Sequence, residues 1–226
     1  MNDNAFTTTT GVGRLGPAFP FVPSTRIPDP DRRPLQIAAL LGSARRASLN
    51  RALLRAVVRV LPDDVIVEPV AIERLPFYDA DLEAADASAE VRAFRDAVSS
   101  ADALLVVTPE YNRSLPAVVK NAIDWASRPR SSAAIAGKPV LLLGATPGTG
   151  GVRHALDHAA AVLAFAGAVP FERRLGVANA AERLGDDGGS PDGGSPDAAL
   201  LTDLADVVGS FADSVRRVTQ EQSAAA

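Results

Sequence analysis

The hydrophobic positions of residues 35–218 alternate between short continuous runs and runs with helical spacing. Continuous apolar runs, which are typical of strands covered on both faces, predict strands at 35–41, 65–70, 103–108, 139–143 and 168–171. Apolar residues at intervals of three and four predict helices at 50–61, 90–100, 116–127, 151–165 and 200–218. Strands that alternate with helices indicate a parallel sheet with helices on both faces. The pattern therefore predicts an α/β fold with a doubly wound, five-stranded parallel sheet in a single domain.

Two segments do not follow this alternation. Residues 1–34 hold a run of four threonines and six prolines without helix or strand spacing, which predicts a flexible N-terminal arm before a domain of residues 35–226. Residues 185–196 lie in a stretch that contains GGSPD twice in succession. Gly, Asp and Pro at this density do not form a packed element, so we expect a flexible surface loop there.

Composition narrows the function classes. The formal net charge is −4 and no block of Lys and Arg occurs, which argues against a nucleic-acid partner. The absence of cysteine excludes disulfides, thiolate metal ligands and a cysteine nucleophile. No apolar run is long enough to cross a bilayer, and the N-terminus lacks the charged and apolar regions of a secretory signal. We therefore expect a cytoplasmic protein without membrane insertion.

The first predicted strand leads into the segment GSARRASLN, residues 42–50, and a helix follows. A helix N-terminus at this edge of a parallel sheet offers unpaired N–H groups and a positive dipole end. The hydroxyls of Ser43 and Ser48, the guanidinium of Arg45 and the amide of Asn50 would add further donors, a set suited to a phosphate. Alternatively, Ser48 or Asn50 caps the helix, which is worth about 1 kcal/mol. The segment alone leaves both interpretations open.

Other known phosphate-binding, hydrolase and metal-site motifs are absent from the sequence or match it only weakly. No G-x-x-x-x-G-K-[ST] loop and no G-x-S-x-G elbow occur. The glycine-rich turn at 148–151 resembles G-x-G-x-x-G, but Arg153 occupies the sixth position, where close helix packing requires a small residue. His154 and His158 share one helix face as in zinc sites, yet no further ligand is obvious downstream, so we expect a solvated or interfacial helix and no metal.

Further motifs follow the phosphate-type loop in a specific order. They are L-P-x-Y-x-x-D at 75–81, T-P-E-Y-N at 108–112, K-N-A-I-D-W at 120–125 and G-K-P-V at 137–140. Together they resemble the NADPH-dependent FMN reductase family, which includes bacterial quinone, chromate and azo-dye reductases, and the resemblance covers residues 35–171. The five strands suit the flavodoxin-like arrangement of that family. The glycine-rich turn departs from several members, which carry Ser where Thr146 stands.

The resemblance implies an FMN cofactor with NADPH or NADH as hydride donor. After the first strand, it assigns cofactor binding, mainly of the phosphate, to Ser43, Arg45, Ser48, Leu49 and Asn50. After the third strand, the isoalloxazine would be lined, largely by backbone groups, by Pro109, Glu110, Tyr111 and Asn112. The turn 146–151 would close the other side of the flavin through Thr146 and Gly148. No catalytic side chain is assigned, because the flavin carries out the chemistry.

The expected activity is hydride transfer from NAD(P)H through FMN N5 to an electron-poor small-molecule acceptor, such as a quinone, an azo compound, chromate or free flavin. The alternative is a non-enzymatic electron carrier or flavin-binding module. Arg113 is a candidate for binding the 2′-phosphate of NADPH. The helix 116–127 has apolar residues on more than one face, which favours a homodimer or homotetramer, as the resemblance also implies. We expect Asp124 and Trp125 in that interface or in the core.

Overall fold

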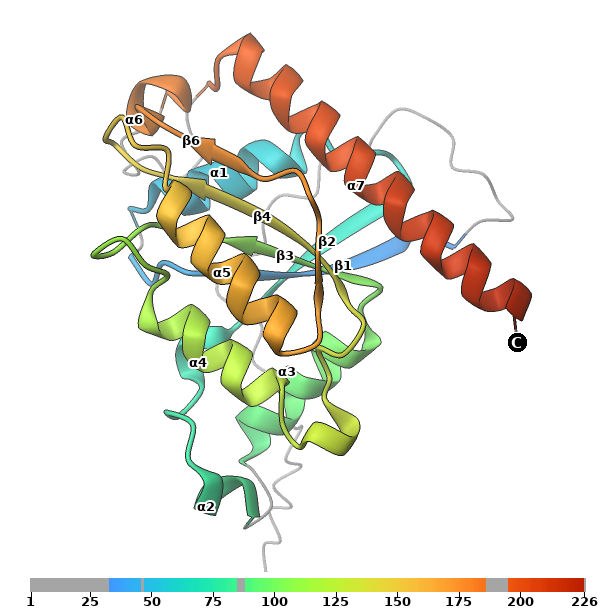
Figure 1. Cartoon of the computed structure of the whole chain (residues 1–226). Coiled ribbons are helices and arrows are strands. Elements are labelled where there is room, and N and C mark those ends of the chain that lie inside the picture. Colours follow the sequence, from blue (N-terminus) through green and yellow to red (C-terminus); the bar gives the residue numbers. More distant parts are fainter. Residues whose placement is uncertain (1–32, 46, 85–87, 186–194, 226) are drawn as a thin grey trace, which may run out of the picture.

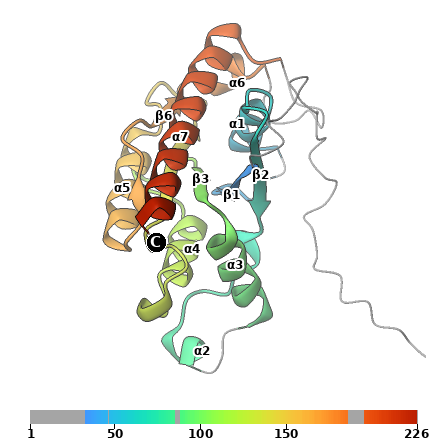
Figure 2. The same cartoon turned by 90° about the vertical axis from the view of Figure 1, so that its right-hand side faces the viewer.

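The computed structural model describes residues 33–45, 47–84, 88–185 and 195–225, and in them a parallel sheet lies between two layers of helices (Figure 1, Figure 2). The strand order is β2-β1-β3-β4-β5, and β6 also pairs with β4. The strands are β1 (Leu35–Leu41), β2 (Val65–Val70), β3 (Ala103–Val107), β4 (Pro139–Ala145), β5 (Val169–Pro170) and β6 (Leu175–Val177). This order confirms the predicted doubly wound, flavodoxin-like α/β fold.

Helices cover both faces of the sheet. One face carries α1 (Leu49–Val58) and α7 (Ala198–Ala225), and the other carries α3 (Ala89–Ser100), α4 (Ala117–Ala126) and α5 (Arg153–Phe165). Shorter elements complete the described chain: η1 (Ile72–Arg74), α2 (Ala80–Ala84), η2 (Arg130–Ser132) and α6 (Ala180–Arg183). In Figure 1, α2 lies away from the sheet, below α4.

The central strand β3 is apolar and buried at every position because it contributes to two cores. Leu104 packs in the cluster shared with α3, α4 and α5, whereas its neighbour Leu105 packs in the cluster shared with α1 and α7. Successive side chains of a strand point to opposite faces, so a central strand with helices on both sides has no solvent-facing position. Burial of each such leucine stabilises the fold by about 1.5–3 kcal/mol.

The strand β6 was not predicted, although all five predicted strands are present. It continues the sheet edge beside the second half of β4, with Leu143 opposite Leu175, while β5 covers the first half. A three-residue strand with Gly176 at its centre gives no apolar run to recognise. The glycine is required there, since a Cβ at Gly176 would lie 1.6 Å from the carbonyl oxygen of Gly151.

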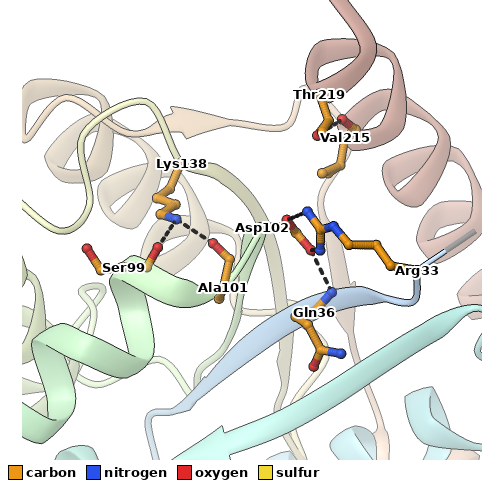
Figure 3. A network of polar contacts seen from close by, with 8 residues as sticks. All are labelled: Arg33, Gln36, Ser99, Ala101, Asp102, Lys138, Val215 and Thr219. Carbon is orange, nitrogen blue, oxygen red and sulfur yellow. Dashed lines mark hydrogen bonds and ion pairs between the residues drawn. The ribbon is translucent and has the colours of Figure 1, made fainter. Parts of the chain in front are cut away.

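Polar contacts hold the amino ends of β1 and β3, where these strands begin (Figure 3). The guanidinium of Arg33 donates to both carboxylate oxygens of Asp102 at 2.6 and 2.9 Å, and the backbone N–H of Gln36 donates to the same carboxylate at 2.8 Å. Burial alone would raise the pKa of Asp102, but these hydrogen bonds hold it below its usual value. Beside it, Lys138 donates to two carbonyls where α3 ends, and burial lowers its pKa.

The two segments expected to be flexible fall mainly outside the described residues. Of the predicted arm, only Arg33 and Pro34 are described, and Arg33 is the residue that pairs with Asp102. Of the repeat segment 185–196, only Gly185, at one end, and residues 195 and 196, at the other, are described.

Candidate cofactor site

Three loops meet at the carboxyl edge of the sheet, toward the left in Figure 1. They are residues 42–45 and 47–48 between β1 and α1, residues 108–116 between β3 and α4, and residues 146–152 between β4 and α5. Because β1, β3 and β4 are parallel neighbours, their carboxyl ends lie side by side. Ligands of open α/β sheets bind at this edge, and all the sequence-predicted site residues lie in these loops or in the first turn of α1.

The loop after β1 has little free space at its start. A Cβ at Gly42 would lie 2.8 Å from Val119 Cγ2 and 2.9 Å from Thr108 Oγ1, so only glycine fits between β3 and α4. Ser43 and Ser48 are buried, whereas the side chain of Arg45 is exposed. The loop therefore approaches the sheet closely and keeps its charged side chain at the surface.

The start of α1 shows whether Ser48 caps the helix. Ser48 occupies the N-cap position, yet its side chain makes no capping hydrogen bond. The first helical bond runs from the N–H of Ala52 to the carbonyl of Ser48, at 3.0 Å, so α1 presents the N–H groups of its first turn without this cap. The capping interpretation of Ser48 is therefore not what the geometry shows.

Asn50 also does not cap α1. Its Nδ2 donates to the carbonyl of Ala145 at 3.0 Å, and its Oδ1 accepts from the N–H of Ala145 at 2.9 Å. Both groups are buried, and the pair joins α1 to the end of β4. The carboxamide of Asn50 thus braces two of the three loops, while Leu49 beside it is half-buried and packs against the core under α1.

The loop after β3 contains a tight turn. Tyr111 and Ser114 exchange two backbone hydrogen bonds, each of 3.0 Å, and the two residues between them, Asn112 and Arg113, have φ values of 52° and 59°. Two successive positive φ angles define a type I′ turn, which Asn adopts readily and Arg does not. The side chain of Tyr111 is 54% exposed at the base of the turn.

Two side chains fasten this turn to α5. The carboxylate of Glu110, just before the turn, accepts from the N–H of Ala155 in the first turn of α5, at 3.2 Å. Ser114, at the end of the turn, has its hydroxyl 2.8 Å from Nδ1 of His158. At the start of the loop, Pro109 is half-buried and its carbonyl accepts from the hydroxyl of the preceding residue, Thr108, at 2.9 Å.

The glycine-rich turn before α5 forms the third wall. Its backbone is held by α6, because the N–H groups of Asn179 and Ala180 donate to the carbonyls of Gly148 and Thr146 at 3.0 and 2.9 Å. The hydroxyl of Thr146 accepts from the N–H of Gly148 at 3.2 Å. The last residue of the turn, Val152, is buried with φ 53° and ψ 24°, a left-handed conformation rare for a β-branched residue. Such strain is concentrated at functional sites.

The remaining motif residues act as scaffold. The carboxamide of Asn121 accepts from the N–H of Tyr78 at 2.7 Å and donates to the carbonyl of Pro76 at 2.8 Å, where the indole of Trp125 also donates. Trp125 is fully buried, and Asp124 forms an ion pair with Lys120. The motif at 75–81 is therefore the partner of the motif at 120–125.

Two polar side chains near the histidine pair of α5 bond to protein groups. His158 contacts Ser114, and Asp157 pairs with Arg174. Among the described residues, no group of three or more His, Asp or Glu side chains is placed to hold a metal ion.

Charge around the three loops is positive although the chain is acidic. Among the described residues, each loop or the helix start behind it carries an exposed arginine: Arg45 after β1, Arg113 after β3 and Arg153 after β4. Three guanidinium groups at one edge of a chain with a net charge of −4 favour an anionic ligand there.

The strand order and the helices on both faces of the sheet define a flavodoxin-like α/β protein, and comparison with known proteins gives the family. Residues 35–182 match the family model of NADPH-dependent FMN reductases. The chain is 43% identical over 131 residues to 2-hydroxy-1,4-benzoquinone reductase from a Burkholderia species, a match that covers 58% of this chain and 71% of that protein. It is 36% identical over 141 residues to a quinone reductase from Escherichia coli, covering 62% and 74%.

A solved structure is similar over nearly its whole length. The flavoenzyme NAD(P)H:(acceptor) oxidoreductase FerB from Paracoccus denitrificans superposes with a TM-score of 0.73 at 32% identity, covering 81% of this chain and 98% of that one. The chain belongs to the NADPH-dependent FMN reductase family. It is an oxidoreductase, with FMN as the family's cofactor and NAD(P)H as its hydride donor, which sets aside the non-enzymatic alternative.

Proposed function

We propose that this chain transfers hydride equivalents from NAD(P)H through FMN to electron-poor small molecules in the cytoplasm, with quinones as the principal acceptors and azo compounds, chromate and free flavin as further ones. The observation that carries the proposal is the start of α1, where buried Ser43 and Ser48 accompany a helix N-terminus that lacks a side-chain cap. Two relatives named as quinone reductases support the choice of acceptor.

The residues present fit the phosphate of FMN. The first-turn N–H groups of α1 form an anion site by geometry and dipole, and the Gly42 backbone leaves no side chain between the loop and β3. Ser43 and Ser48 would donate hydroxyl hydrogen bonds, and Arg45 would add a charge-assisted one. Asn50 would contribute by holding the start of α1 against the end of β4, because its side chain is already bonded to Ala145.

The other two loops would hold the ring system. Residues 109–112 would line one side of the isoalloxazine and Thr146 with Gly148 the other. Bound FMN supplies hydride acceptance at N5 and electron transfer to the acceptor. Backbone N–H groups of these loops would stabilise negative charge on the ring. The exposed Tyr111 would stack against the nicotinamide or the acceptor, and Arg113 would bind the 2′-phosphate of NADPH.

The test is an absorbance spectrum of the FMN-reconstituted protein before and after addition of NADPH without oxygen. We expect bound flavin that bleaches rapidly and recovers when a benzoquinone is added. Arg45→Ala should raise the dissociation constant of FMN about tenfold, equal to roughly 1.4 kcal/mol of a charge-assisted contact. Arg217→Ala, an equally exposed arginine on α7, is the matched control. Absence of bound flavin in the wild type would refute the proposal.

We also propose a homodimer formed across the groove between α4 and α5. The apolar residues of α4 that suggested a subunit contact, among them Val119, Ile123 and Trp125, are buried in the chain's own core. The groove beside them has a volume of about 690 Å³ and carries both charges of the Lys120–Asp124 pair. A second copy fits this self-complementary surface across a two-fold axis.

The side chain of Phe165, at the end of the groove, is 83% exposed. Phe165→Glu should therefore give a monomer in light scattering, while Phe77→Glu, at a side chain 81% exposed outside the groove, should not. A wild-type chain that is monomeric at micromolar concentration would contradict the dimer.

A further inference from the structure

The loop after β3, residues 108–116, is fastened to α5 at both ends of its tight turn. Glu110 precedes the turn and accepts from the N–H of Ala155, and Ser114 ends it with its hydroxyl 2.8 Å from His158. Ala155 lies in the first turn of α5 and His158 three residues later, so the two contacts hold the loop at neighbouring turns of that helix. The turn between them carries Tyr111.

The same helix begins at the glycine-rich turn that forms the opposite wall of the site. Val152 ends that turn and is the N-cap of α5. The position of α5 therefore sets the separation of the two walls, provided that the loop after β3 remains attached to it. Glu110 attaches the loop to a backbone group, whereas the contact at the far end depends on two side chains, Ser114 and His158.

We infer that His158 is a positioning residue of the enzyme, which holds the Tyr111–Ser114 turn against α5 and thereby fixes the wall that receives the isoalloxazine. This inference rests on the proposed FMN site. In the described part of the chain, the side-chain hydrogen bond of His158 is to Ser114, and its role is to restrict the loop after β3 rather than to touch reacting atoms. The hydroxyl and the imidazole each donate or accept, so the bond persists whichever of the two supplies the proton.

The geometry identifies which ring atom matters. The contact is made by Nδ1, the nitrogen nearer the backbone, and the amide of Asn places a polar atom at that position, whereas the longer Gln mimics Nε2. His158→Asn should therefore retain the bond, and His158→Gln should lose it. His154, one turn earlier on α5, has no side-chain hydrogen bond to another described residue, so His154→Gln is the matched control.

The experiment measures the FMN dissociation constant by flavin fluorescence for each variant, with the melting temperature recorded alongside. We expect His158→Gln and Ser114→Ala each to weaken FMN binding about two- to tenfold, the range for loss of one hydrogen bond. The double variant should be no weaker than either single one, because both remove the same contact. His158→Asn should bind as the wild type does, and melting temperatures should stay within about 2 °C.

Several outcomes would overturn the inference. They are unchanged FMN affinity in His158→Gln, additive losses in the double variant, or an equal loss in His154→Gln, which would place the effect in α5 as a whole. Failure of the wild-type chain to bind FMN would instead refute the proposed function, so the two failures are distinguishable.

Discussion

Asn50 offers the sharpest test of how the site is built. Its carboxamide makes two buried hydrogen bonds, at 2.9 and 3.0 Å, to the N–H and C=O of Ala145. In Asn50→Ala both peptide groups lose their partner in a region where Asn50 is 3% and Ala145 2% exposed. Each buried group left unpaired costs about 1–3 kcal/mol. The free energy of unfolding should therefore fall by about 2–6 kcal/mol.

Urea denaturation followed by circular dichroism measures this loss. With an m-value of about 2.5 kcal/mol/M for a domain of this size, the midpoint should shift down by roughly 0.8–2.4 M. Ser48→Ala is the control, because its hydroxyl makes no capping bond and its removal should change the free energy of unfolding by less than about 0.5 kcal/mol.

FMN affinity separates the two roles further. Ser48→Ala should weaken FMN binding while leaving stability intact, and Asn50→Ala should lower both, because the loops that it joins move apart. A loss of less than 1 kcal/mol in Asn50→Ala would refute the bracing role. A large loss of stability in Ser48→Ala would restore the capping interpretation.

Two further predictions concern contacts that support the sheet, at Asp102 and at Gly176. Although burial opposes it, the hydrogen bond from Arg33 holds the pKa of Asp102 below its usual 3.8, so this carboxylate stabilises the fold above about pH 4 and the gain is lost as pH falls through the lowered pKa. The difference in free energy of unfolding between wild type and Asp102→Asn, measured in urea at pH 7 and at pH 3, should therefore be smaller at pH 3. An equal difference at both pH values would contradict this prediction. Gly176→Ala should lower the free energy of unfolding by more than about 3 kcal/mol, because the added Cβ meets the backbone of Gly151. Gly209→Ala, in open space on α7, should raise the free energy of unfolding by up to about 1 kcal/mol. Equal effects in the two variants would show that the contact between residues 176 and 151 relaxes.

The sheet was predictable because its strands are buried on both faces. The apolar run at residues 35–41 gave β1 with its correct ends, and Pro62 and Pro116 marked helix limits to within a few residues. Edge elements were not predictable for the opposite reason. Strand β6 is short and is determined by contact with β4 and with Gly151, which lies 25 residues earlier in the chain.

The residues that the sequence predicted for the site lie together at one edge of the sheet, but their individual contacts were not predictable. The pattern GSARRASLN identified the loop, yet nothing local indicates that Asn50 bonds to Ala145, 95 residues away. The same holds for Glu110 with Ala155 and for the hydroxyl of Ser114 with His158. Such contacts depend on the relative placement of two strands and a helix, which periodicity does not specify. Val152 gave no signal either, because its strained backbone is visible only in φ.

These contacts explain why the motifs contain particular side chains although few of those side chains face the three loops of the candidate site. Asn121 and Trp125 hold Pro76, and Asn50 holds the end of β4. A flavin ring bound mainly by backbone N–H groups needs those groups at fixed positions, and side chains supply that fixity by bonding to the main chain of neighbouring segments. Substituting a bracing residue should therefore impair FMN binding as strongly as substituting a residue that contacts FMN, but with an accompanying loss of stability. Measuring both quantities for each variant separates the two kinds of residue.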